Sequence, residues 1–177
     1  MKATYPAVSK GLHWLVAVLV GGLLALGFYM TGLPLSPQKL QFYSWHKWAG
    51  VSVFALAWVR LAWRWLQPAP PLPQHLPPLP RMAAHAGHAA LYLLMLAVPL
   101  SGWLMSSAKG VKTVWFGVVP LPDLLARDRA LGETLAGVHG ALNWLLLALI
   151  AGHVAAALFH HFVHKDGTLH RMLPARA

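Results

Sequence analysis

The sequence has no cysteine, only four acidic residues and few charged residues of either sign. The absence of cysteine excludes disulfides, thiolate zinc sites, iron–sulfur clusters and haem attached through Cys-x-x-Cys-His. Charged residues make up 10% of the 177 residues, against about 25% in soluble domains, whereas hydrophobic residues make up 58%. Because a soluble domain of this size cannot bury so much apolar surface, the composition predicts an integral membrane protein.

The few charges are mostly basic, with 14 Lys and Arg against 4 Asp and Glu, for a net charge of +10. A basic protein that binds nucleic acid presents such charges on a polar surface patch. In this sequence they stand at the ends of apolar runs, where they hold helices against anionic lipid headgroups. We therefore expect membrane lipid, and no nucleic acid, as a partner.

Four apolar runs approach the roughly 20 residues that cross a bilayer, and they predict helices at residues 12–30, 45–65, 85–106 and 134–162. Helices are expected because backbone polar groups in lipid must be satisfied within the segment. The first run follows Lys2 and Lys10 but is too long for the core of a cleavable signal peptide. We predict an all-α fold, a transmembrane four-helix up-and-down bundle that forms one domain over residues 1–177.

The segments between these runs are expected to be loops. Thr31–Ser44 contains Pro34 and Pro37, and Gln67–Pro80 has seven prolines in fourteen residues, which indicates an extended linker. Ala108–Gly132 is the longest connection. With the first residues in the cytoplasm, eight Lys and Arg lie inside and six outside, so the positive-inside rule predicts that both termini are cytoplasmic.

Without cysteine, the eleven histidines are the candidate metal ligands. His139 and His153 are 14 residues apart, so they lie within about 40° of one helix face and about 21 Å apart along the axis. His13 begins the first helix at the level of His153, and His46 begins the second at the level of His139. The pattern predicts two six-coordinate b-type haems, held by His13 with His153 and by His46 with His139. The alternative is four polar residues that bond between helices.

Arg60 and Gly27 lie 14 residues after His46 and His13, so each shares a face with one of these histidines. Arg60 is a candidate partner of a haem propionate, or else an anchor whose side chain reaches the membrane surface. Gly27 either leaves room for a porphyrin or aids helix packing.

His85 and His88 lie three residues apart at one end of the third helix. They are interpreted as propionate contacts, quinone contacts or interfacial residues. His75, in the proline-rich linker, and His170, near the C-terminus, are expected to be exposed. Most tryptophans lie near predicted helix ends, as in an interfacial belt: Trp14, Trp45, Trp48, Trp63, Trp65, Trp103 and Trp115.

A polar cluster lies at the end of the fourth predicted helix. It consists of His160, His161 and His164 together with Lys165. These side chains form either a polar pocket that accepts a quinone oxygen or a solvated helix end.

The whole chain resembles the bacterial cytochrome b561 family of small dihaem proteins of the inner membrane. The motifs that carry the resemblance are His13-Trp14-Leu15, Val59-Arg60-Leu61, and His85-Ala86-Gly87-His88 followed by Leu91-Tyr92 and Pro99. The most specific stretch is GHVAAALFHHFVHKDGTLHRMLP, residues 152–174.

This resemblance implies a bundle in the bacterial inner membrane, haem b as cofactor and a role in respiratory electron transport. The family's axial ligands fall on His13, His46, His139 and His153. One branch, the superoxide oxidases, oxidises superoxide at the periplasmic face and reduces ubiquinone, and His160 matches a position near that quinone. The resemblance thus implies a superoxide:ubiquinone oxidoreductase that transfers electrons across the membrane.

Charges in the longest loop bear on superoxide, which is a small anion. The basic side chains that attract it are Lys109, Lys112, Arg127 and Arg129. The acids that weaken this attraction are Asp123, Asp128 and Glu133.

Two other functions compete with this interpretation. The chain can instead be a membrane anchor that carries electrons from a partner dehydrogenase and has no substrate site of its own. Short loops offer little surface for such a partner. A transporter that uses histidines as a path is the second alternative, and it calls for intramembrane acids, which all four apolar runs lack.

Overall fold

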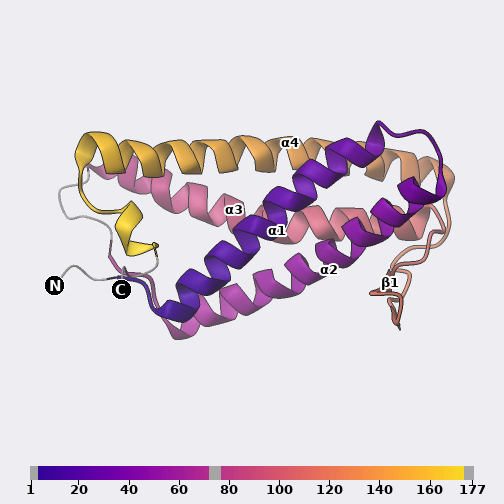
Figure 1. Cartoon of the computed structure of the whole chain (residues 1–177), viewed down its shortest axis with the longest axis horizontal. Coiled ribbons are helices and arrows are strands. Elements are labelled where there is room, and N and C mark those ends of the chain that lie inside the picture. The colour runs from indigo at the N-terminus through magenta and orange to yellow at the C-terminus, as the bar shows by residue number, and fades with distance from the viewer. Residues whose placement is uncertain (1–3, 72–76, 174–177) are drawn as a thin grey trace.

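The computed structural model describes residues 4–71 and 77–173. Its long helices are α1 (Ala7–Thr31), α2 (Pro37–Leu66), α3 (Pro78–Ala108) and α4 (Arg129–Phe159). A π-helical turn, η1 (His160–His164), continues α4, and a 3-10 turn, η2 (Leu169–Arg171), follows it. The four helices run back and forth along the long axis of the molecule (Figure 1). The predicted all-α four-helix bundle is confirmed.

Each helix is longer than its apolar run, and at the starts of α2 and α4 a polar side chain that lies outside the run caps the helix. The Ser36 side chain accepts a hydrogen bond from the Lys39 N–H and starts α2 at Pro37, so most of the predicted loop Thr31–Ser44 is helical. Asp128 caps α4 in the same way through the Leu131 N–H. The proline-rich linker also ends early, because Pro78 is tolerated in the first turn of α3. His75 lies outside the described residues.

The connection between α3 and α4 contains a small hairpin that the sequence did not predict. Strand β1 (Val114–Trp115) pairs antiparallel with β2 (Val119–Pro120). Gly117 makes the reversal with a φ of 73°, a backbone conformation that glycine adopts without strain. The Trp48 indole N–H donates to the Val114 carbonyl, which ties the hairpin to α2. We call this end of the bundle the hairpin end.

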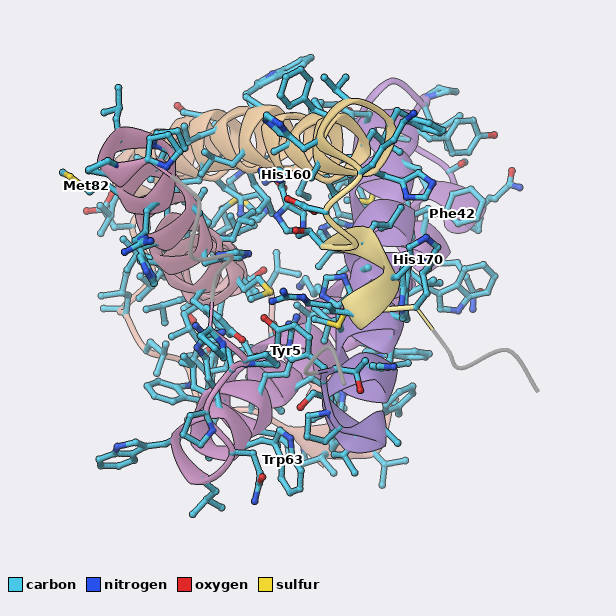
Figure 2. The ribbon with its side chains drawn as sticks, turned by 90° about the vertical axis from the view of Figure 1, so that its left-hand side faces the viewer. Tyr5, Phe42, Trp63, Met82, His160 and His170 are labelled. Carbon is cyan, nitrogen blue, oxygen red and sulfur yellow. The ribbon has the colours of Figure 1, made fainter. Side chains whose placement is uncertain are left out.

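The opposite end holds the start of α1 and the C-terminal turns, and we call it the terminal end (Figure 1). There the chain after α4 folds back over the bundle. The Tyr5 N–H donates to the Arg171 carbonyl, and the Trp14 indole N–H donates to the Met172 carbonyl. The segment 165–172 is therefore a hook fastened to α1. Figure 2 shows it in yellow, lying across the end of the bundle from α4 toward α1.

The helices pack in three layers spaced by seven residues, the repeat that keeps one helix face turned to its neighbours. The middle layer is apolar and buried: Val20, Val53, Met95 and Leu146. Seven residues toward the hairpin end stand Gly27, His46, Gly102 and His139. Seven residues toward the terminal end stand His13, Arg60, His88 and His153. The histidines and Arg60 thus lie on the same helix faces as the buried apolar residues of the middle layer.

Among the residues that the structure describes, three segments are long and apolar enough to span a membrane: Ala7–Thr31, Pro78–Ala108 and Arg129–His164. The remaining expected run, residues 45–65, lies in α2 (Pro37–Leu66) and is not among these three. Helix α2 completes the bundle but carries Lys39, Lys47, Arg60 and Arg64 along its length. Large apolar side chains such as Val18, Leu93 and Trp144 are more than 60% exposed, which suits contact with lipid tails.

Candidate functional site

At the hairpin end, the rings of His46 and His139 face each other across the bundle. Their centres are 6.4 Å apart and their planes cross at 85°. A glycine on a neighbouring helix lies against each ring. A Cβ added at Gly27 would stand 3.2 Å from the Cε1 of His46, and one at Gly102 would stand 3.1 Å from the Cε1 of His139. Gly27 therefore makes room for a ring of the pair, a use that neither sequence interpretation named.

Helix α3 also holds His139 by hydrogen bonds. The Nδ1 of His139 lies 3.1 Å from the Val98 carbonyl oxygen and 2.9 Å from the Ser101 hydroxyl oxygen. The Ser101 hydroxyl itself donates to the Val98 carbonyl at 2.7 Å. Within the described chain, by contrast, the buried Nδ1 of His46 has no hydrogen-bond partner.

At the terminal end, His13 and His153 form the second pair. Their ring centres are 6.2 Å apart, with the planes tilted by 58°. The Arg60 guanidinium lies 3.4 Å from the His13 Nδ1, and the His88 ring centre is 5.4 Å from that of His153. The structure thus brings together all four predicted ligands, in the two predicted pairs. It also separates the two histidines of α3, because His88 faces the pair and His85 is exposed.

The spacing of both pairs suits an iron between facing rings. Two imidazole nitrogens about 2 Å from one metal place their ring centres about 6 Å apart. Both predicted pairs have this separation, whereas the 5.4 Å between His88 and His153 is shorter. The cavity beside His46 and His139 is lined mostly by apolar side chains, among them Leu23, Leu94 and Val98, as the sites of hydrophobic cofactors are.

Two arginines of α2 surround one aromatic ring at the terminal end. Arg60 and Arg64 lie with their guanidinium carbons 5.4 Å and 5.7 Å from the centre of the Tyr92 ring. Arg60 is half-buried in the bundle, and within the described residues no salt bridge to an acid is found for it. A guanidinium only donates hydrogen bonds. Arg60 is thus suited to an anionic group such as a carboxylate near His13.

Beyond the second pair, His160 continues the same face of α4, seven residues after His153. Its Nδ1 lies 2.5 Å from an Asp166 carboxylate oxygen, and the second oxygen accepts the Thr168 N–H. Burial raises the pKa of Asp166, but the hydrogen bonds from Thr168 and His160 outweigh it and lower the pKa to about 2. Asp166 is therefore ionised at neutral pH and holds His160 with a proton on Nδ1.

The other polar residues near His160 are arranged more loosely. The centre of the His164 ring lies 5.2 Å from that of His160, and the rings of His161 and His170 meet edge-on with their centres 4.9 Å apart. His170 is exposed, as predicted. Figure 2 looks onto this end and shows His160 above the hook and Tyr5 below it.

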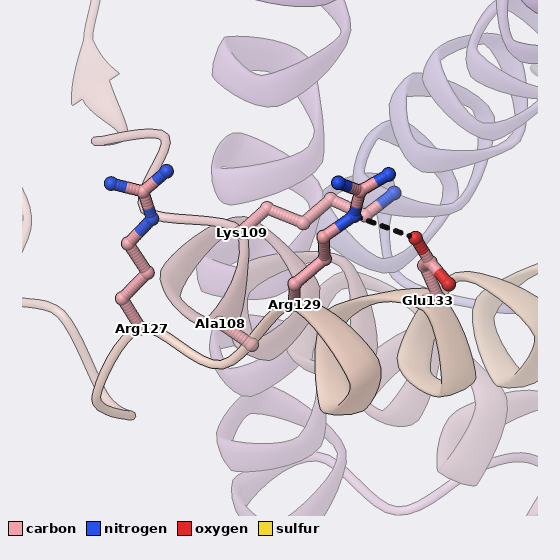
Figure 3. A pocket seen from close by; sticks show the side chains of 5 residues that line it. All are labelled: Ala108, Lys109, Arg127, Arg129 and Glu133. Atoms are coloured by element: carbon pink, nitrogen blue, oxygen red, sulfur yellow. Dashed lines mark hydrogen bonds and ion pairs between the residues drawn. The ribbon is translucent and has the colours of Figure 1, made fainter.

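At the hairpin end a basic depression of about 380 Å³ lies where α3 ends and α4 begins. It is lined by Lys109, Arg127, Arg129 and Glu133, together with Ala108 (Figure 3). Glu133 pairs with Arg129 at 3.1 Å, and both side chains are exposed. Lys109 and Arg127 are the remaining positive charges of the depression.

The fold and the paired histidines define a class of protein: a transmembrane helical bundle whose interior presents facing imidazoles, as membrane-bound b-type cytochromes do. The family model described as prokaryotic cytochrome b561 matches residues 4–175. The chain is 38% identical to "Cytochrome b561 homolog 2" of Escherichia coli (strain K12), covering 96% of this chain and 90% of that protein. It is 30% identical to "Probable superoxide oxidase CybB" of Yersinia pestis, covering 99% of each.

The chain therefore belongs to the prokaryotic cytochrome b561 family. A further relative, "Cytochrome b561 homolog 1" of Escherichia coli (strain K12), is 31% identical over 93% of this chain and 94% of its own length. Membership makes this chain a multi-pass protein of the bacterial inner membrane that binds b-type haem and transfers electrons.

Sequence reasoning missed several residues of the candidate site. Ser101 and Gly102 had no signal in their own right, because serine and glycine are common in membrane helices. The seven-residue spacing from His88 through Met95 to Gly102 was the available clue. Asp166 was visible as the only acid after residue 133, and its position six residues after His160 did not reveal the contact.

Proposed function

We propose that the chain is a dihaem cytochrome b with His13 and His153 as the ligands of one haem and His46 and His139 as those of the other. The observation that carries this proposal is the pair of ring separations, 6.2 and 6.4 Å, at two levels of one bundle. Haem b supplies a one-electron carrier at each level when it is bound. With a histidine pair to hold it at each level, a bound haem would serve electron transfer rather than oxygen binding.

We further propose that the electrons pass from superoxide at the periplasmic face to ubiquinone near the cytoplasmic face. Two superoxide anions, one quinone and two protons give two dioxygen molecules and one quinol. The name of the Yersinia pestis relative, at 30% identity, supports this direction. With both termini in the cytoplasm, the hairpin end is periplasmic and the terminal end is cytoplasmic.

The hairpin end suits an anionic substrate. Lys109 and Arg127 leave net positive charge in the basic depression after Arg129 is paired with Glu133. A cleft lined by one sign of charge raises the local concentration of a small counter-ion. We infer that this depression collects superoxide at the hairpin end, beyond the level of His46 and His139.

The terminal end suits a proton-coupled acceptor. Since Asp166 takes the Nδ1–H of His160, the Nε2 of that ring remains for a quinone oxygen. When His160 is doubly protonated, this nitrogen donates a proton to the reduced oxygen, and Asp166 stabilises the charge on the ring. His160 is 21% exposed, so a ligand can reach it, whereas Asp166 is only 3% exposed.

The test is to supply superoxide enzymatically to purified, haem-loaded protein with a soluble ubiquinone. We expect haem reduction followed by quinol formation, and added superoxide dismutase should abolish both. The variant His160→Gln should keep haem reduction and lose most quinol formation. His161→Gln is the matched control, because that ring lies on the same turn and contacts Phe162 and His170 instead.

If superoxide leaves the haems oxidised while dithionite reduces them, the superoxide proposal fails. The electron-carrying anchor of a partner dehydrogenase is then the better account. Equal quinol formation by the His160 and His161 variants would leave the superoxide step intact and remove His160 from the quinone site.

A further inference from the structure

The four proposed ligands do not receive equal support from their surroundings. His139 is hydrogen-bonded through Nδ1 to two oxygens of α3. Within the described chain, the buried Nδ1 of His46 has no partner. The Nδ1 of His13 lies 3.4 Å from the Arg60 guanidinium, which cannot accept a hydrogen bond from it. The hairpin-end pair therefore contains one ligand that is fixed by hydrogen bonds, which sets it apart from the terminal-end pair.

The partner atoms determine which nitrogen of His139 carries the proton. The Val98 carbonyl oxygen can only accept a hydrogen bond, so a contact at 3.1 Å requires a proton on Nδ1. The Ser101 hydroxyl gives its own proton to that same carbonyl at 2.7 Å, which turns its oxygen lone pairs toward His139. Nε2 is then unprotonated, as a metal ligand must be.

The same turn of α3 also fixes where the ring stands. Gly102 leaves the space that the ring occupies, since a Cβ there would approach the Cε1 of His139 to 3.1 Å and its Nδ1 to 3.4 Å. Ser101 and Gly102 are adjacent, so one helical turn supplies both the hydrogen bond and the room. Ring orientation and tautomer are thus set by groups of α3.

We propose that Ser101 and the Val98 carbonyl are positioning groups for His139 and that they make the hairpin-end haem the lower-potential haem of the two. A ligating histidine that donates its other N–H to an oxygen becomes more basic, and a more basic ligand stabilises ferric iron. At the other level, the positive charge of Arg60 beside His13 favours the reduced iron. Electrons that enter at the hairpin end then move energetically downhill to the terminal end.

This inference rests on the proposed haem ligands, and it is tested by potentials rather than by turnover. Redox titration of purified protein should resolve two haem components. The variant His46→Leu should remove the lower-potential component, which assigns it to the hairpin end. Ser101→Ala should raise the midpoint potential of that component and leave the midpoint potential of the other component unchanged. It should also change the low-temperature EPR signal of one haem only.

Ser107→Ala is the matched control. Ser107 is a buried serine on the same helix that donates to the Trp103 carbonyl and accepts the Leu124 N–H, and no hydrogen bond joins it to a histidine of the described residues. We expect it to leave both midpoints unchanged. Gly102→Ala, which pushes the ring out of its hydrogen bonds, should raise the same midpoint as Ser101→Ala.

The outcomes separate the two claims. If His46→Leu keeps both haems, the proposed ligands themselves are wrong. If His46→Leu loses one haem and the missing component is the one with the higher potential, the proposed ligands stand and the inference about potentials is wrong. That inference is also wrong if the midpoint potentials of Ser101→Ala equal those of the Ser107→Ala control.

Discussion

At the terminal end, a single contact gives the partly buried His160 a defined position for its proton. His160 lies on the ligand-bearing face of α4, and one contact, to Asp166, fixes its tautomer. That contact spans six residues and depends on the left-handed conformation of Lys165, with a φ of 50°, which turns the chain back after η1. The hook is therefore the structural element that converts a helix end into a candidate proton-donating site.

The stability of the hook should depend on pH through Asp166. Its folded pKa, about 2, lies below the ordinary value of 3.8, so ionisation stabilises the folded hook. This contribution is complete above about pH 4 and is lost as the pH falls through about 2. Hydrogen exchange of residues 165–172 should show protection that declines on acidification.

Asp166→Asn should lower the protection of the hook at neutral pH and remove this pH dependence. Residues of the α1–α4 core should exchange equally in both proteins. Identical protection of the hook in wild type and variant at neutral pH would show that the carboxylate does not hold it.

At the scale of elements, the seven-residue repeat explains why ligands and core share the same helix faces. Val53 separates His46 from Arg60 on α2, and Leu146 separates His139 from His153 on α4. Both spacers are buried, 2% and 4% exposed. Tight packing of this middle layer holds the two histidine levels at a fixed distance.

Gly27, which lies against the His46 ring, is predicted to be needed for full haem content. Gly27→Val should press on the His46 ring, because even a Cβ there would lie 3.2 Å from Cε1. We expect the haem content to fall from two toward one per chain, measured by pyridine haemochrome. Gly21→Val on the same helix is the control, since nothing lies within 4 Å of its Cβ position. Equal haem content in both variants would contradict the role of Gly27.

The sequence predicted the elements whose signals are local or periodic. The apolar runs gave four helices, and the 14-residue spacings gave the two levels and the position of Arg60 beside His13. It failed where the signal depends on the folded chain. The start of α2 at Pro37, the hairpin at Val114–Pro120 and the contact between His160 and Asp166 all depend on caps, turns or contacts that apolar periodicity does not encode.

At the scale of the whole molecule, the two ends of the bundle differ in chemistry. The hairpin end presents basic side chains above His46 and His139, whereas the terminal end presents the His160–Asp166 contact beyond His13 and His153. An apolar layer separates them. Such an arrangement suits a protein that accepts electrons at one face of a membrane and delivers them at the other.

The central claim is that two facing histidine pairs hold two b-type haems, and haem content tests it most directly. Purified protein should contain two haems per chain by pyridine haemochrome and show the sharp reduced bands of six-coordinate haem b after dithionite. His46→Leu and His153→Leu should each retain one haem, with different midpoint potentials. A chain that carries no haem, or one from which both variants lose the same haem, would contradict the account.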